Sequence, residues 1–116
     1  MDKRQHNRIA LEGTGWRAEL IDQISGNKLG EVVNLSAGGL MLITPRAVEI
    51  ESLYQVECLS TSPAGEKGRF TAGTMVLWRT AASQTHTYWA GLQIIDIDAA
   101  SKARLRALGV AMAAND

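Results

Sequence analysis

Two short groups of polar residues in the N-terminal part of the chain could hold an anionic ligand. Arg4 and Arg8 stand four positions apart in the sequence RQHNR, and Asn34 and Ser36 precede Gly38 in the sequence NLSAGG. A guanidinium group can hold a phosphate, or the O6 and N7 edge of a guanine, through two parallel hydrogen bonds. Asparagine and serine side chains can hydrogen-bond a base or a phosphate, and a glycine lets the backbone come close to a ligand. Together the two groups predict a pocket for an anionic nucleotide.

Each group also has an ordinary structural explanation. Two arginines in a polar N-terminal segment can simply be solvated. The sequence from Asn34 to Gly39 can be a tight turn between strands, in which the polar side chains hydrogen-bond their own backbone. That explanation accounts for the turn but not for its position after the arginine pair, and this order of the two groups favours a binding site.

The composition limits the partners of the protein. Its 116 residues are enough for one domain, and 12 basic residues balance 12 acidic ones, so that the formal net charge is zero. We therefore expect no extended contact with DNA, RNA or an anionic membrane surface, and any anion site must be a local cluster. The chain lacks the apolar region of a signal peptide and any stretch long enough to span a bilayer. These features predict a cytoplasmic protein without membrane insertion.

The residue types needed for catalysis or metal binding do not form a recognisable set. His6 and His86 are far apart in polar surroundings, and Ser36 lacks the strand, sharp turn and helix that surround a nucleophilic serine. Asp96 and Asp98 lie between the last predicted strand and a predicted helix, where capping of the helix is the better explanation. We therefore expect no enzyme, no metal and no cofactor.

The rest of the chain predicts a small β-barrel as the framework of the site. Short apolar runs alternate with turn signals, and Tyr54, Val56 and Cys58 share one face of an alternating run. Short connections favour antiparallel pairing, and a small antiparallel sheet avoids exposed edges best by closing on itself. We expect a mainly β fold, a six-stranded antiparallel barrel, with strands near 16–23, 29–35, 38–44, 53–59, 69–79 and 88–95.

The two ends of the chain differ from this middle part. Residues 1–15 are polar, charged and interrupted by two glycines, which predicts a flexible N-terminal arm that carries the arginines. Near the other end, Leu105, Leu108 and Met112 follow the spacing of a helix, and Asp98 is suited to cap its first turn. The predicted organisation is one domain over residues 1–116, with an arm at 1–15, a barrel at 16–97 and a helix at 98–116 that covers the barrel.

The order RxxxR followed by NxSxxG, at positions 4–8 and 34–39, resembles the signature of the PilZ domain family of bacterial cyclic di-GMP receptors. The sequences VLWR at 76–79 and YWAGLQI at 88–94 are similar to the last hairpin of these domains. A terminal helix follows that hairpin in the family, as it is predicted to do here. The resemblance therefore covers nearly the whole chain.

The resemblance assigns polar contacts to four of these residues. Arg4 and Arg8 would contact the phosphates and the guanine of cyclic di-GMP, with a guanidinium group stacked on the base. Asn34 and Ser36 would bind the guanine edge and a phosphate or ribose oxygen. The family more often has Asp at the position of Asn34, and the amide offers one acceptor fewer towards the guanine N–H groups.

The resemblance also assigns roles to neighbouring residues. Gly38 and Gly39 would let the backbone approach the ligand, and Trp78 would add an aromatic wall. Lys3, just before the first arginine, occupies a position that the family associates with binding one ligand molecule or an intercalated pair, and a cation there is compatible with the pair.

The resemblance implies a receptor without catalytic activity. Binding of cyclic di-GMP would order the N-terminal arm, change the surface of the domain and so regulate an effector protein that the sequence does not identify. An alternative is a PilZ-like adaptor that works through protein contacts with little or no affinity for the nucleotide. A barrel that binds single-stranded RNA or DNA is disfavoured, because basic residues are not interleaved along the strands.

Overall fold

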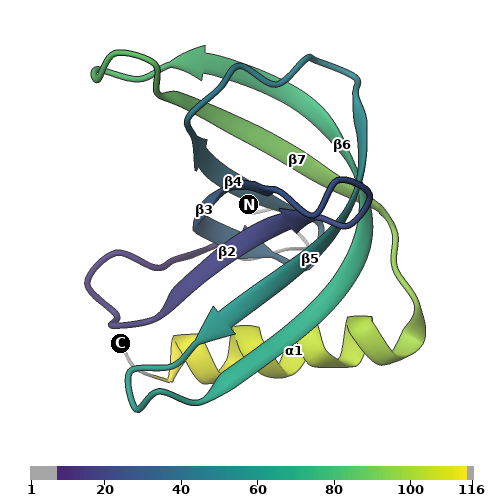
Figure 1. The fold of residues 1–116 in the computed structure, drawn as a ribbon. Helices are drawn as coiled ribbons and strands as arrows, with labels where there is room; N and C mark the ends of the chain where they lie inside the picture. Colours follow the sequence, from purple (N-terminus) through teal and green to yellow (C-terminus); the bar gives the residue numbers. More distant parts are fainter. Residues whose placement is uncertain (1–7, 115–116) are drawn as a thin grey trace, which may run out of the picture.

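Six antiparallel strands close into a barrel, and a helix packs against one of its ends (Figure 1). The computed structural model describes residues 8–114. Its elements are β1 (Ile9–Ala10), β2 (Arg17–Asp22), β3 (Lys28–Ser36), β4 (Gly39–Thr44), β5 (Leu53–Thr61), β6 (Lys67–Ala81), β7 (Tyr88–Asp96) and α1 (Ala99–Ala113). Around the barrel the order is β3, β2, β5, β6, β7 and β4, and β4 pairs with β3 to complete the circle. The predicted fold, a mainly β six-stranded antiparallel barrel with a C-terminal helix, is confirmed.

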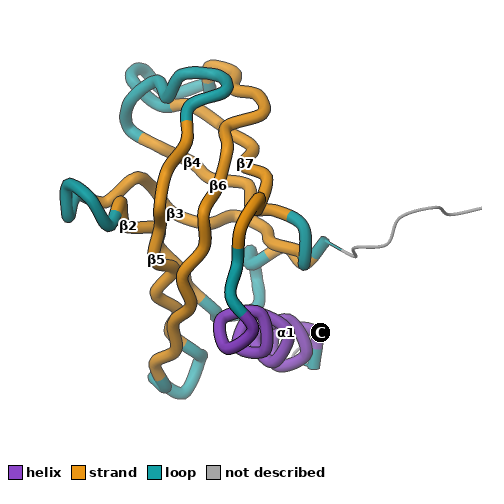
Figure 2. The backbone as a smooth tube through the Cα atoms, turned by 90° about the vertical axis from the view of Figure 1, so that its right-hand side faces the viewer, coloured by secondary structure: helices purple, strands orange, loops and turns teal. Residues whose placement is uncertain are grey.

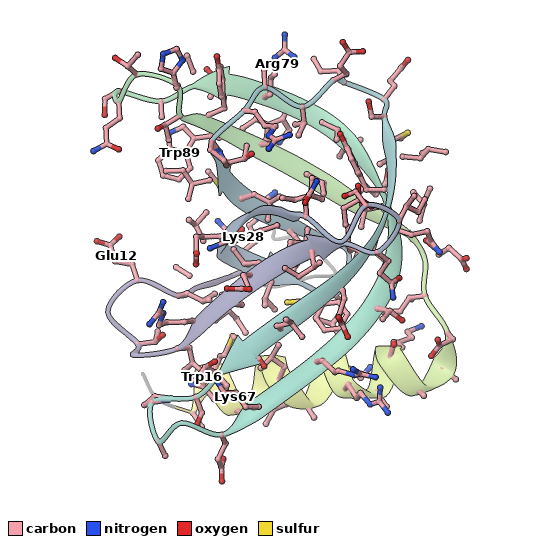
Figure 3. The ribbon with its side chains drawn as sticks, in the orientation of Figure 1. Glu12, Trp16, Lys28, Lys67, Arg79 and Trp89 are labelled. Carbon is pink, nitrogen blue, oxygen red and sulfur yellow. The ribbon has the colours of Figure 1, made fainter. Side chains whose placement is uncertain are left out.

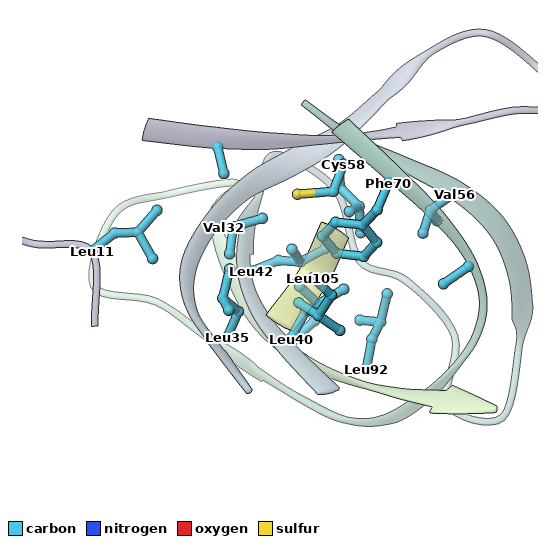
Figure 4. Close-up of a cluster of buried hydrophobic side chains, with 14 of the residues drawn as sticks. Leu11, Val32, Leu35, Leu40, Leu42, Val56, Cys58, Phe70, Leu92 and Leu105 are labelled. Carbon is cyan, nitrogen blue, oxygen red and sulfur yellow. The ribbon is translucent and has the colours of Figure 1, made fainter. Parts of the chain in front are cut away.

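Apolar side chains that alternate along the strands fill the barrel (Figure 4). Val56 and Cys58 of β5 are fully buried, whereas Gln55 on the opposite face is exposed, as the alternating run predicts. Leu42 of β4 and Phe70 of β6 are also buried from solvent. Burying one large apolar side chain contributes about 1.5–3 kcal/mol, so this interior is what stabilises the closed sheet.

Both ends of the barrel are covered. At one end the loop between β4 and β5 places Val48 in the core, and the Nη1 atom of Arg79 donates a hydrogen bond to the Val48 carbonyl oxygen at 2.8 Å (Figure 3). At the other end α1 packs beneath the strands (Figure 2). It contacts β6 and β1. Leu105 and Met112 of α1 are buried and Leu108 is partly buried, so the helix covers the barrel with the apolar face predicted from its spacing.

Part of the segment expected to form an arm belongs to the barrel. Ile9 of β1 pairs with Leu35 of β3, and the backbone N–H of Leu11 donates to the Val33 carbonyl oxygen at 3.0 Å. The Leu11 side chain is buried in the core. The folded body therefore begins by Ile9, earlier than the boundary expected at residue 16, because a two-residue strand and one buried leucine tie this segment down.

Asp98 caps the start of α1, as predicted. Its Oδ1 atom accepts a hydrogen bond of 2.7 Å from the Ser101 backbone N–H. The Ser101 side chain, itself buried, accepts a 3.0 Å hydrogen bond from the Thr71 N–H of β6 and so ties the first turn to the barrel.

We expect Asp98→Ala to lower the free energy of unfolding by about 1 kcal/mol, because the Ser101 N–H loses its acceptor. Urea denaturation followed by circular dichroism would measure this loss. Asp98→Asn keeps an acceptor oxygen and should retain most of the stability. If alanine and asparagine were equally well tolerated, the cap would have no role in holding α1.

Candidate functional site

A pocket of about 580 Å³ collects the predicted site residues that lie in the described part of the chain. Side chains and backbone from β3, β4, β6 and β7 line it, together with the residue before β1. A volume of this size is typical of small-molecule sites. The predicted residues that it brings together are Arg8, Asn34, Ser36, Gly38, Gly39 and Trp78. Lys3 and Arg4 were also predicted, and they lie outside the described residues.

Strand pairing explains why residues distant in sequence meet here. Asn34 of β3 lies opposite Met41 of β4, Met41 lies opposite Gly91 of β7, and Gly91 lies opposite Trp78 of β6. These four residues form a row across the outer face of the barrel, perpendicular to the strands. Cross-strand neighbours are close enough for direct contact, so the row is one continuous surface.

A second row runs beside the first. Ser36 pairs with Gly39, and Gly39 pairs with Gln93 of β7. Ile9 of β1 pairs with Leu35 of β3, so Arg8 and Ser36 are each the next residue beyond this pair, and both line the pocket. Gly39 in this row and Gly91 in the first have no side chains, and the pocket lies over this part of the sheet.

Two irregularities in the strands turn two of the predicted site residues outward. Val32 and Leu35 of β3 are both buried although three positions separate them, because the register shifts between Val32 and Asn34. In a regular strand Asn34 would share the inward face of Val32, and the bulge moves it to the outer face. In β6 the register also shifts, between Val76, which is buried, and Trp78. This shift places Trp78 in the pocket.

Trp78 lies directly on Gly91. A Cβ atom added at Gly91 would come within 2.1 Å of the Trp78 Nε1 atom and 2.4 Å of Cε2. An aromatic ring that covers a glycine on the neighbouring strand is a recognised device for stabilising sheets. The glycine therefore fixes the position of the indole wall.

Gly39 is required by the barrel as well as available to a ligand. A Cβ atom there would come within 2.6 Å of the Leu92 carbonyl oxygen on β7, which is a backbone atom that cannot move aside easily. The sequence suggests that this glycine leaves space for a ligand. The structure adds a different reason, the close approach of β4 to β7.

The polar groups in the pocket keep hydrogen-bonding capacity. The Ser36 Oγ atom accepts a 3.3 Å hydrogen bond from the Gly38 N–H, which is the turn contact expected of this sequence and leaves its own hydrogen free to be donated. The Asn34 Nδ2 atom donates to the Met41 Sδ atom at 3.3 Å, and a thioether is a weak acceptor. Both side chains could therefore bind a polar ligand without losing a strong internal contact.

Arg8 gives the pocket its charge. Among the described residues that line the pocket it is the charged one, and it is exposed. No carboxylate lines the pocket in this part of the chain, so its local charge favours an anion. The sequence did not single out Gly91 or Gln93 as site residues, although both lie within the sequence YWAGLQI at 88–94, which resembles part of the last PilZ hairpin.

A β-barrel that carries a cationic pocket on its outer face is an arrangement suited to binding a small ligand. The family model of the PilZ domain matches residues 2–109, and the chain therefore belongs to the PilZ domain family. No curated protein sequence matches it significantly. In residues 8–114 there is no helix long and apolar enough to cross a membrane.

Several solved structures share the fold at low sequence identity. The PilZ domain of Escherichia coli YcgR with cyclic di-GMP has a TM-score of 0.69 and 10% identity, over 97% of this chain and 93% of that one. The Bacillus subtilis inhibitor of motility MotI has a TM-score of 0.68 and 14% identity, and this chain covers 54% of its length. E. coli YcgR in complex with cyclic di-GMP has a TM-score of 0.72 and 13% identity, with 47% of its length covered. The TM-scores show a common fold, and at these identities the likeness shows the fold alone.

Proposed function

We propose that this PilZ domain is a receptor for cyclic di-GMP. The observation that carries the proposal is the pocket in which Arg8, Asn34, Ser36 and Trp78 come together from three separate parts of the chain. The similar PilZ domain of E. coli YcgR was solved with cyclic di-GMP, which supports the same ligand class here.

Each group in the pocket matches a part of the dinucleotide. The Arg8 guanidinium can hold a phosphate or the O6 and N7 edge of a guanine. The Asn34 amide and the Ser36 hydroxyl can bind the base edge and a phosphate or ribose oxygen. Trp78 offers an indole face against which a base can stack, and such stacking contributes about 1–3 kcal/mol per base.

Residues before Arg8 complete the site in this proposal. Arg4 supplies a second guanidinium four positions from Arg8, and Lys3 adds a further positive charge. Binding of the ligand orders the N-terminal residues across the pocket, and the changed surface regulates an effector protein. The receptor performs no chemistry, acts in the bacterial cytoplasm and has no need of DNA, RNA or a membrane, in keeping with its zero net charge.

The test is isothermal titration with cyclic di-GMP, with GTP and cyclic AMP as controls. We expect Arg8→Ala and Arg4→Ala each to weaken binding at least tenfold, since a hydrogen bond to a charged group contributes about 1.5–3 kcal/mol. The thermal transition should hardly change, because the Arg8 side chain is exposed. Arg46→Ala removes an exposed arginine that does not line the pocket and should bind as wild type does.

Two outcomes would contradict the proposal. Wild-type protein that gives no heat with cyclic di-GMP at high concentration would favour the adaptor function, in which the domain works through protein contacts. Arg8→Ala with unchanged affinity would show that the ligand binds elsewhere.

A further inference from the structure

A second cleft lies beside the ligand pocket, between the β3–β4 turn, the linker after β7 and the first half of α1. Its volume is about 660 Å³, and Lys102 and Arg106 of α1 line it. We propose that these two side chains form a second phosphate-binding site for the same cyclic dinucleotide, an inference that rests on the proposed function. The pocket around Arg8 would hold one phosphate and base of the ligand, and this cleft would hold the other phosphate.

The two cavities are neighbours that share two lining residues. Gly38 and Ile94 line both of them. The Ile94 N–H donates a hydrogen bond to the Gly38 carbonyl oxygen at 2.9 Å, so the cavities adjoin at this hydrogen-bonded pair. Gly38 has no side chain that could stand between the cavities. A ligand in the first pocket could therefore extend past this pair into the second.

The charges of the cleft favour an anion. Lys102 and Arg106 are one helical turn apart and so lie on the same face of α1, where two like charges repel each other. Both side chains are exposed. Within residues 8–114 neither forms an ion pair with a carboxylate, whereas Arg69, for example, pairs with Glu57. Asp96 is the acidic residue in the lining, so two cations face one carboxylate. A phosphate between the two cations would relieve their repulsion.

The remaining lining suits a nucleotide better than a simple ion. Ile95, Ile97 and Leu105 contribute apolar surface, and Ile95 is half exposed although it is a large aliphatic residue. Aliphatic surface next to cations matches a ligand that carries a planar base or a sugar beside its phosphate. Cyclic di-GMP has two phosphates and two bases, which accounts for two adjoining cationic sites on one face of the domain.

The proposal is tested by titrating wild-type protein and the double variant K102A/R106A with cyclic di-GMP at low and moderate salt. We expect the double variant to bind at least tenfold more weakly and to lose part of the salt dependence, because two charges that contact the ligand are gone. The matched control is K67A/R104A. It removes two cations that line a different cleft, on another face of α1, and it should bind as wild type does.

The same titrations separate this inference from the proposed function. Wild-type protein that does not bind would overturn both. If wild type binds, Arg8→Ala fails to bind, and K102A/R106A binds with wild-type affinity, the first pocket stands and the second phosphate site is wrong. Should the double variant prove poorly folded by circular dichroism, the charge-preserving variant K102R/R106K is decisive. It must keep wild-type affinity while K102Q/R106Q loses it, and equal affinity for the two would overturn the site.

Discussion

Gly91→Ala is expected to weaken cyclic di-GMP binding at least tenfold, although the substitution adds a single methyl group. The added Cβ atom would lie 2.1 Å from the Trp78 Nε1 atom, so the indole has to leave its place over β7. Trp78 lines the pocket, and in the proposed function a base of the ligand stacks against it, so displacement of the indole should weaken binding. Overfilling a packed position of this kind also costs about 1–3 kcal/mol of stability.

A double-mutant cycle with Trp78→Ala isolates this contact. In the wild-type background Gly91→Ala should lower the free energy of unfolding, and in the Trp78→Ala background the same substitution should have little effect, because no indole is in the way. Urea denaturation of the four proteins measures the stabilities, and titration measures the affinity. Equal costs in both backgrounds, or an unchanged affinity of Gly91→Ala, would show that the indole does not depend on this glycine.

The framework of the site could be predicted from the sequence because the strands have one buried and one exposed face. The alternation around Val56 and Cys58 identifies β5, and the turn signals between runs identify most strand ends to within a few residues. The helix was predictable for a similar reason, since Leu105, Leu108 and Met112 repeat with its period and Asp98 stands where a cap is needed.

The pocket itself depends on features that alternation does not reveal. A bulge inserts one extra residue, so every later side chain of the strand points to the opposite face of the sheet. Without the bulge between them, alternation would place Asn34 inside the barrel with Val32. The same holds for Trp78 after Val76. The resemblance to a family located these residues, whereas their outward orientation became clear only from the register of the paired strands.

β1 shows a second limit of the sequence. Two residues in a strand give no period to detect, and Ile9 and Leu11 are surrounded by polar residues that are typical of an arm. Ile9 pairs with Leu35 of β3, which is more than twenty positions away in the sequence, and Leu11 packs in the core. Such contacts depend on the tertiary structure and leave no local pattern in the sequence. The pairing of Ile9 with Leu35 is what brings Arg8 and Ser36 to the same pocket.

Cys58 is expected to react with a thiol reagent at pH 8 about a thousandfold more slowly in the native protein than in denaturant. The thiolate is the reactive form, and burial in the apolar core raises the pKa of the Cys58 thiol from 9.0 to about 12. Three pKa units correspond to about a thousandfold less thiolate at this pH, and the closed barrel further hinders access of the reagent. With dithiobis(nitrobenzoic acid) as the reagent, the absorbance of the released thionitrobenzoate measures the rate. A native rate close to the denatured rate would show that β5 opens readily.

The same shift makes the stability of the barrel sensitive to alkaline pH. Below pH 9 the thiol is protonated in both states, and its contribution to stability is fully present. Between pH 9 and about 12 the unfolded state loses the proton while the folded state keeps it, so the free energy of unfolding falls as the pH rises. Cys58→Ala lacks this group, and the difference in stability between wild type and this variant should be constant below pH 9 and shrink above it. A difference that stays constant up to pH 11 would mean that the folded thiol ionises as easily as the unfolded one, and that the interior of the barrel admits water beside Cys58.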